Sequence, residues 1–356
     1  MSFSPAEQHA MRRALELAAT PGVPLGPNPR VGCVLLSPDG VAVAEAYHRG
    51  AGTPHAEAAV LTEAGADARG TTAVVTLEPC NHTGRTGPCS QALIEAGVAR
   101  VVFAQPDPNP VASGGEASLR AAGMQVDFGL MEREARALNR AWTFAMEHDR
   151  PFVTWKFATT LDGRSAAADG TSRWVTSRAA RVDSHRLRAQ CDVIVVGTGT
   201  VEADDPELTV RDEYDEPLAH QPLRAVVGTR ELDPGRRVFN DRSETVRLET
   251  RDPAEALALL HDLDRLHVFL EGGPQLAAAF LRAGLVDEVV AYVAPSLLGA
   301  GTNAVADLGI TSITDARRLR IDDVTTVGTG SEANVRITMR FDTRAGALPT
   351  TTDERD

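Results

Sequence analysis

The sequence lacks the features that mark membrane and secreted proteins. It contains no run of about 18 apolar residues, which is the length that a membrane-spanning helix needs. Its N-terminal stretch carries charged residues at helical spacing, where a signal peptide needs an unbroken apolar segment. We therefore expect a cytoplasmic protein that has no membrane partner.

Cysteine, aromatic residues and positive charge are also scarce. Four cysteines in 356 residues are too few for a disulfide scaffold, so metal ligation or burial explains them better. The net charge is −13, aromatic residues make up 4%, and Lys156 is the only lysine. Because a nucleic-acid reader needs a broad basic surface with interleaved aromatic residues, we expect no nucleic-acid partner. An anionic substrate would have to meet local arginines.

The chain does have the length and composition of a two-domain globular protein. Its length is about twice that of a common single domain, and 43% hydrophobic with 24% charged residues is an ordinary globular mixture. Ser4 and Glu7 form a capping box that begins a helix, and a hairpin is predicted over 31–36 and 41–47. From residue 55 helices and strands alternate, which predicts a largely parallel sheet covered on both faces.

The second half repeats the α/β pattern without copying the first. Strands are predicted at 152–157, 193–196, 224–227, 267–270 and 288–293, helices at 177–190, 254–263 and 275–283, and a closing antiparallel pair at 319–327 and 334–341. The charged, proline-containing segment 148–151 marks a boundary. We expect domains at residues 1–148 and 149–343, followed by a disordered tail at 344–356.

A metal-binding pattern lies in the first half. His55 and Glu57 open a predicted helix, and Cys80 and Cys89 follow a predicted strand. One imidazole and two thiolates can hold Zn²⁺ and leave a fourth position for water, whose pKa the metal lowers. Glu57 is then the proton carrier and not a ligand, because it can take the water's proton and return it to a leaving amine. The combination indicates a zinc-dependent deaminase.

One feature of this pattern departs from the common deaminase signature, and two other functions remain open. Eight residues separate the cysteines, where the signature has two.

A deaminase of nucleic-acid bases would use the second half as a binding domain, and retention on a polyanion column would reveal it. A non-catalytic zinc module would need a fourth protein ligand, for which Glu57 or His82 could be recruited. Spectroscopy of a cobalt-substituted form distinguishes that case.

Longer motifs surround these residues. They are TLEPCNHTGRTGPC at 76–89, PNPRVG at 27–32 and DPNP at 107–110, and in the second half KFATTLDG at 156–163, LRA at 187–189, TV at 200–201, DDP at 204–206, LTVR at 208–211 and EGG at 271–273. With them the chain resembles the bifunctional pyrimidine deaminase/reductase family of riboflavin biosynthesis, over nearly its whole length except the tail.

The resemblance implies a fold and two successive reactions. It implies an α/β protein with an N-terminal cytidine-deaminase-like three-layer domain and a C-terminal dihydrofolate-reductase-like α/β domain. The first domain would hydrolytically deaminate 2,5-diamino-6-(5-phosphoribosylamino)pyrimidin-4-one, with one Zn²⁺ per chain. The second would use NADPH to reduce the ribosylamino group of the product to ribitylamino, chiefly by holding cofactor and substrate in position. We also expect a homo-oligomer.

The resemblance also implies site residues beyond the zinc pattern. The deaminase substrate would contact Asn28, His48, Arg85, Asp107 and Asn109. NADPH would contact Ala158, Trp174, Thr200, Asp204, Thr229 and the stretch Gly273, Pro274, Gln275, Leu276, Ala277, Ala278 and Ala279. The reductase substrate would contact Lys156, Ser172, Arg188, Leu208, Arg211 and Glu271.

The residues alone support these assignments unevenly. Two strand-to-glycine turns, at 197–199 and 272–273, would let a cofactor approach the backbone closely. By itself, however, His48 fits an exposed loop histidine, Trp174 a core aromatic and Arg188 a solvated helix face. Asn28 and the 107–110 run also fit turn chemistry. Cys33 and Cys191 are expected to be small buried side chains.

Overall fold

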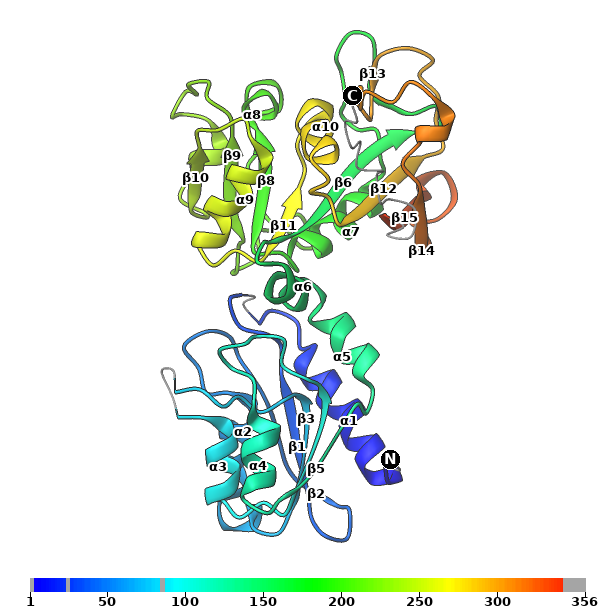
Figure 1. Ribbon diagram of the computed structural model, residues 1–356. Helices are drawn as coiled ribbons and strands as arrows, with labels where there is room; N and C mark the ends of the chain where they lie inside the picture. The colour runs from blue at the N-terminus through cyan, green and yellow to red at the C-terminus, as the bar shows by residue number, and fades with distance from the viewer. Residues whose placement is uncertain (1–2, 24–25, 84–86, 342–356) are drawn as a thin grey trace, which may run out of the picture. The chain divides into compact units, whose positions relative to one another are not determined.

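The computed structural model describes residues 3–23, 26–83 and 87–341 and divides into two compact units (Figure 1). The first unit comprises Met1–Pro151 with Asp264–Leu266, and the second comprises Phe152–Leu263 with His267–Asp356. Each unit has its own β-sheet and its own hydrophobic core. The tail predicted at 344–356 and Arg85 lie outside the described residues.

The first unit is built on a five-stranded sheet in the order β2-β1-β3-β4-β5. Its strands are β1 (Gly32–Leu36), β2 (Ala42–Tyr47), β3 (Thr72–Leu77), β4 (Arg100–Gln105) and β5 (Gln125–Phe128). β3, β4 and β5 are parallel, as predicted, whereas β1 is antiparallel to both β2 and β3. The predicted hairpin is therefore confirmed, and it forms the edge of the sheet.

Helices cover both faces of this sheet. They are α1 (Pro5–Ala18), α2 (Ala56–Ala64), α3 (Cys89–Glu95), α4 (Gly115–Ala121), α5 (Glu132–Leu138) and α6 (Arg140–His148). Alternate residues of β1 point to opposite faces: Cys33 and Leu35 pack toward α2, α3 and α4, while Val34 and Leu36 pack toward α1 and α5. The capping box of α1 forms as predicted, with Glu7 N–H donating to Ser4 Oγ at 3.2 Å. The result is a three-layer unit.

The second unit is built on an eight-stranded sheet in the order β10-β9-β8-β11-β6-β12-β15-β14. The strands are β6 (Phe152–Thr160), β8 (Val193–Gly197), β9 (Leu223–Val227), β10 (Thr245–Leu248), β11 (His267–Leu270), β12 (Glu288–Ala294), β14 (Leu319–Val327) and β15 (Asn334–Phe341). Neighbouring strands from β10 to β12 in this order (β10, β9, β8, β11, β6 and β12) are parallel. β15 pairs antiparallel with both β12 and β14. The predicted closing antiparallel pair is confirmed at its predicted bounds. A separate two-stranded sheet pairs β7 (Arg164–Ala166) with β13 (Thr302–Asn303).

Four helices cover the two faces of the larger sheet. They are α7 (Arg178–Arg188), α8 (Thr198–Asp204), α9 (Pro253–Asp262) and α10 (Pro274–Arg282). α9 and α10 share one core with β8 and β11, while α7 and α8 pack on side chains of the opposite face. β10 and α8 were not predicted; residues 197–199, which precede and begin α8, were interpreted only as a turn. Among the described residues, no helix is long and apolar enough to cross a membrane.

The contact of α1 with β1 predicts one stability effect. A Cβ added at Gly32 would lie 2.0 Å from the backbone oxygen of Ala14, so helix and strand would have to separate. Gly32→Ala should therefore lower the free energy of unfolding by about 1–3 kcal/mol, measured by urea denaturation. Gly87→Ala is the matched control, because a Cβ there meets nothing within 4 Å. Equal stability of the two variants would contradict the tight helix–strand contact.

Candidate active sites

A cluster of three metal-ligating side chains lies at the edge of the first sheet. His55 precedes the first turn of α2, Cys80 follows β3, and Cys89 begins α3. The ligand atoms of these residues all lie within 4.8 Å of one another, and His55 Nδ1 is 3.6 Å from Cys80 Sγ and 3.3 Å from Cys89 Sγ. One imidazole nitrogen and two sulfurs are a donor set that suits zinc. The three predicted ligands are thus brought together.

The two thiols of this cluster affect each other strongly. Hydrogen bonds, first from the Cys89 thiol and then from His55, lower the pKa of Cys80 to about 4. The neighbouring Cys80 thiolate, and then burial, raise the pKa of Cys89 well above its usual range. Cys80 therefore ionises readily, and its thiolate opposes ionisation of Cys89. A bound cation would let both sulfurs be thiolates, which fits a metal site.

Glu57 lies next to this cluster in the first turn of α2. Its side chain is only 3% exposed. Burial, the dominant effect, raises the pKa of Glu57 to about 7, and the Cys80 thiolate adds to the increase. A carboxyl group that titrates near neutral pH can both accept and release a proton, which general acid–base catalysis requires. Its position and its pKa suit the predicted role as proton carrier.

His48 and Asn28 form a pair close to the metal ligand His55. Asn28 Nδ2 lies 3.0 Å from His48 Nε2, and His48 Nδ1 lies 3.0 Å from the carbonyl oxygen of Pro54. The ring centroids of His48 and His55 are 5.5 Å apart. His48 is 6% exposed, so its interpretation as an exposed loop histidine was wrong. Burial lowers the pKa of His48, and a neutral ring that donates to Pro54 accepts from Asn28.

Asp107 and Asn109 begin the loop that follows β4. Asp107 Oδ1 accepts the N–H of Asn109 at 2.8 Å, and Asn109 Oδ1 accepts the N–H of Val111 at 3.0 Å. Asp107 N–H in turn donates to the buried Glu78 carboxylate at 3.1 Å. Burial, followed by the charges of Glu78 and Cys80, raises the pKa of Asp107 to about 6. The loop is thus next to the metal-binding segment.

A second polar cluster lies in the second unit, where β6, β11 and α7 meet. Arg188 donates to Glu271 Oε2 through Nε at 3.0 Å and Nη2 at 2.6 Å, and Lys156 Nζ is 3.9 Å from Glu271 Oε1. Burial alone would raise the pKa of Glu271, but Arg188 and then Lys156 outweigh it and hold that pKa low. Burial lowers the pKa of Lys156, which Glu271 opposes. Glu271 Oε1 has no hydrogen-bond partner among the described residues, so it can accept one from a ligand.

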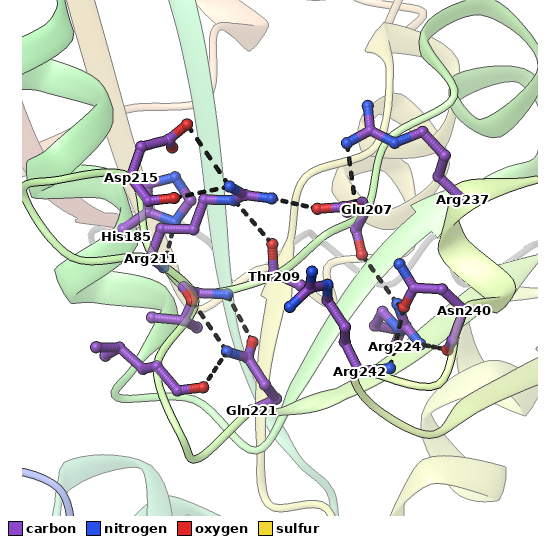
Figure 2. A network of polar contacts seen from close by, with 12 residues as sticks. His185, Glu207, Thr209, Arg211, Asp215, Gln221, Arg224, Arg237, Asn240 and Arg242 are labelled. Carbon is purple, nitrogen blue, oxygen red and sulfur yellow. Dashed lines mark hydrogen bonds and ion pairs between the residues drawn. The ribbon is translucent and has the colours of Figure 1, made fainter.

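Arg211 is connected to this cluster through Thr209. Arg188 donates to the Thr209 carbonyl at 2.9 Å, and Arg211 Nε donates to Thr209 Oγ1 at 3.1 Å. His185 Nδ1 accepts the backbone N–H of Arg211 at 3.2 Å. Arg211 also pairs with Glu207 (Figure 2). Lys156, Arg188, Arg211 and Glu271 therefore belong to one network, and Arg188 is not a solvated helix residue.

The same figure shows how the loop that carries Arg211 is anchored. Arg224 of β9 is completely buried and donates to the Glu207 carbonyl at 3.1 Å and to Asn240 Oδ1 at 2.8 Å (Figure 2). Glu207 also pairs with Arg237 at 3.2 Å. A buried guanidinium with these acceptors fixes the backbone of the loop to the sheet.

The predicted cofactor residues gather at the carboxyl ends of three neighbouring parallel strands. Thr200 follows β8, Thr229 follows β9 and Gly273 follows β11. Gly273 N–H donates to Thr200 Oγ1 at 3.2 Å, which joins two of these ends. A Cβ at Gly272 would lie 2.6 Å from Leu276 Cδ2 and 3.0 Å from Leu276 Cβ, so the Leu276 side chain would have to shift to admit it. Ligands of open α/β sheets bind at such edges, and the residues fit a dinucleotide there.

The other residues predicted to contact the cofactor or the reductase substrate differ in exposure and in contacts. Trp174 is 68% exposed, and the guanidinium carbon of Arg181 lies 4.2 Å from its ring centroid, so its interpretation as a core aromatic was wrong. Leu208 packs its side chain in the α8 core, so a ligand could meet only its main chain. The carbonyl of Asp204 accepts from Arg173, the carbonyl of Ser172 accepts from Val175 N–H, and Ala158 lies in β6 opposite Tyr292. Of the α10 residues, Ala277 and Ala278 are buried.

Sequence reasoning gave no role to two residues of these sites. Glu78 precedes Pro79 and Cys80 in the quoted motif, and His185 lies three positions before Arg188 on α7. Burial, then Arg188, lowers the pKa of His185 to about 4, so it stays neutral and accepts from Arg211. The i, i+3 spacing of His185 and Arg188 was a signal that could have identified His185.

Two family descriptions match the chain. Residues 4–105 match "Cytidine and deoxycytidylate deaminase zinc-binding region", and residues 151–332 match "RibD C-terminal domain". Riboflavin biosynthesis protein RibD of Mycobacterium tuberculosis is 50% identical over 303 residues, covering 85% of this chain and 89% of the relative. The protein of the same name from Escherichia coli is 40% identical over 356 residues, covering 90% and 97%.

Solved structures agree with these matches. Acinetobacter baumannii RibD has a TM-score of 0.87 at 36% identity, covering 95% of this chain and 99% of the other. A Thermotoga maritima protein described as a diaminohydroxyphosphoribosylaminopyrimidine deaminase/5-amino-6-(5-phosphoribosylamino)uracil reductase has a TM-score of 0.84 at 30% identity, with the same coverage. The predicted fold class, a cytidine-deaminase-like and a dihydrofolate-reductase-like domain, is confirmed.

The metal centre predicts a clear difference between two cysteine variants. Cys89→Ser should lose most of the bound zinc, because it removes one of three ligands, whereas Cys191→Ser in the second unit should retain it. Metal analysis after dialysis measures this, and the absorption bands of the cobalt-substituted protein report the number of thiolate ligands. Undiminished zinc in Cys89→Ser would mean that another side chain completes the site.

Proposed function

Because this chain belongs to the RibD family of riboflavin biosynthesis proteins, we propose that its two reactions are carried by two separate sets of side chains. The chain is a bifunctional enzyme with a zinc-dependent deaminase and an NADPH-dependent reductase. The first reaction is hydrolytic deamination of 2,5-diamino-6-(5-phosphoribosylamino)pyrimidin-4-one. The second is reduction of the ribosylamino group of the product to ribitylamino.

We assign deamination to the metal cluster and the side chains around it. His55, Cys80 and Cys89 would hold zinc, which supplies the Lewis acidity that makes water a nucleophile at neutral pH. Glu57 takes the proton of that water and delivers it to the leaving amine, and its buried position suits both steps. Asn28, His48, Asp107 and Asn109 would orient the pyrimidine. Arg85 is proposed for the phosphate from its place in the family motif alone.

We assign reduction to the second polar cluster and the strand ends beside it. The ends of β8, β9 and β11, with Thr200, Thr229 and the start of α10, would hold NADPH, which would supply the hydride. Lys156 and Glu271 would hold the sugar and the pyrimidine, since Glu271 Oε1 keeps an acceptor without a hydrogen-bond partner among the described residues. Further contacts are proposed from Arg188, Arg211, Ser172 and Leu208 to the substrate, and from Ala158, Trp174 and Asp204 to the cofactor.

The observation that carries this assignment is the gathering of His55, Cys80 and Cys89 within 4.8 Å in a chain of this family. A coupled assay tests it: the enzyme receives the phosphoribosylamino-pyrimidine, and ammonia release and NADPH oxidation are followed separately. Both signals are expected, with ammonia appearing first. Absence of both would refute the proposed function.

Three other expectations from the sequence stay predictions. They are the domain limits at 1–148 and 149–343, the homo-oligomer and the cytoplasmic location. Light scattering measures the oligomeric state, and cell fractionation tests the location.

The first prediction from this assignment concerns Glu57. Glu57→Gln keeps the size of the side chain but removes the proton carrier, so deamination should fall by about 10²- to 10⁴-fold while the zinc content is unchanged. The same variant, given substrate that is already deaminated, should oxidise NADPH at the normal rate. A parallel loss of both activities would contradict two independent sites.

The second prediction concerns Lys156, whose ammonium nitrogen lies 3.9 Å from Glu271 Oε1 and 5.6 Å from the centroid of the Tyr292 ring. Arg188 already donates two hydrogen bonds to Glu271 Oε2, so a guanidinium at position 156 could not pair with both carboxylate oxygens as its planar shape favours. Lys156→Arg and Lys156→Ala should both lower reductase kcat/KM, by roughly 10- to 100-fold if one charge-assisted hydrogen bond is lost.

Deamination by both Lys156 variants serves as the internal control and should be unchanged. Near-normal reduction by Lys156→Arg would mean that the site needs only the positive charge. Normal reduction by Lys156→Ala would remove this residue from the mechanism.

A further inference from the structure

Glu78 is a buried carboxylate beside the metal-binding segment. It has no role in the two reactions as proposed so far. It is 7% exposed and lies two positions before Cys80. A buried ionised group is costly unless strong donors surround it, so the partners of Glu78 indicate what it does.

Three backbone N–H groups donate to this carboxylate, and all three come from one segment. Oε2 accepts from Asp107 at 3.1 Å, while Oε1 accepts from Gly114 at 3.2 Å and from Glu116 at 3.0 Å. The two oxygens therefore hold the beginning and the end of the segment 107–116. This segment carries Asp107 and Asn109 and leads into α4.

Hydrogen bonds continue from Asp107 along the loop. Asp107 Oδ1 accepts the N–H of Asn109, and Asn109 Oδ1 accepts the N–H of Val111, so each side chain fixes the backbone two residues ahead. Once Glu78 fixes the backbone of Asp107, the positions of both side chains proposed to bind substrate follow.

The other end of the segment is fixed to the same strand end. A Cβ added at Gly115 would lie 1.8 Å from the carbonyl oxygen of Pro79, so α4 begins in direct backbone contact with the residue between Glu78 and Cys80. Asn81 N–H donates to the Ala112 carbonyl at 2.8 Å. Residues 78–81 therefore present a metal ligand and also hold the loop.

We propose that Glu78 is a positioning residue of the deaminase, which holds the substrate-binding loop 107–116 in register with the metal ligand Cys80 through three backbone hydrogen bonds. The inference rests on the proposed function, because it takes Asp107 and Asn109 as substrate contacts. In this role Glu78 acts through the backbone of the loop and not by contact with the substrate or the metal. It acts by keeping the pyrimidine-binding side chains at a fixed distance from the reacting centre.

Glu78→Gln tests the proposal with a minimal change. The amide keeps one oxygen, which can serve Gly114 and Glu116, but it presents an NH₂ group to the N–H of Asp107, where two donors repel. The deaminase KM should rise by about 10- to 100-fold, with kcat changed by less than about threefold, because loss of a substrate-orienting contact weakens ground and transition states alike. Zinc content and reductase activity should be unchanged.

Glu116→Gln is the matched control. It makes the same chemical change in the same segment, but the Glu116 carboxylate is partly exposed and pairs with Arg120 at 2.7 Å on the surface of α4. Surface pairs of this kind contribute little, so its deaminase KM should equal that of the wild type.

A double-mutant cycle separates positioning from general support of the fold. In an Asp107→Ala background, Glu78→Gln should change KM by less than about threefold, because the Asp107 side chain, through which Glu78 acts on the substrate and on Asn109, is gone. Full multiplication of the two effects would overturn the proposal. Loss of zinc in Glu78→Gln, or a lower kcat at unchanged KM, would also overturn it, since Glu78 would then support the metal site or the fold.

Failure of the proposed function is recognisable separately. A wild-type enzyme that releases no ammonia would refute that function before any variant is compared. A wild type that deaminates, with Asp107→Ala unchanged in KM, would refute the loop as a substrate contact, and with it the role of Glu78.

Discussion

Neighbouring parallel strands end at the same edge of a sheet, and this constraint places the ligand-binding residues of both units. In the first unit β3 and β4 are adjacent and parallel, so the segments that carry Cys80 and Asp107 begin side by side. In the second unit β8 and β11 are adjacent, which lets Gly273 N–H reach Thr200 Oγ1. The fold thus brings together residues that lie far apart in the sequence. Hydrogen bonds between their side chains then fix the final positions of these residues.

The sequence predicted the strands well because their signals are local. Strand-favouring runs bounded by turn residues predicted β11, β14 and β15 at the observed limits. The short strand β10 was missed because it combines a four-residue length with a central arginine. Helix α8 was missed because its Gly-Thr-Gly start also fits a turn. The motif residues of the zinc site were identified for the same local reason, since each follows a recognisable strand or opens a helix.

Burial and contacts could not be predicted, because they depend on partners that are distant in the chain. His48 is buried and pairs with Asn28, which is 20 positions away. The donors to Glu78 are 29 to 38 positions away, so nothing near residue 78 indicates their existence. Trp174 is exposed although tryptophan usually packs inside, and Leu208 is buried although its motif indicated a ligand contact. Family motifs supplied the identity of these residues but not their surroundings.

Two buried carboxylates show how the same group serves different purposes. Both oxygens of Glu78 accept from backbone N–H groups, which cannot move away without unfolding the loop. Glu271 is held by two cations, Arg188 and Lys156, and one of its oxygens has no hydrogen-bond partner among the described residues. A carboxylate whose two oxygens both accept from backbone N–H groups holds those backbone groups in place. A carboxylate with one buried oxygen that lacks a donor is stabilised when a ligand donates a hydrogen bond to it. Folding has already removed water from that oxygen, so binding adds no further desolvation cost. The difference in partners therefore explains why Glu78 belongs to the framework of its site and Glu271 to the surface that binds substrate.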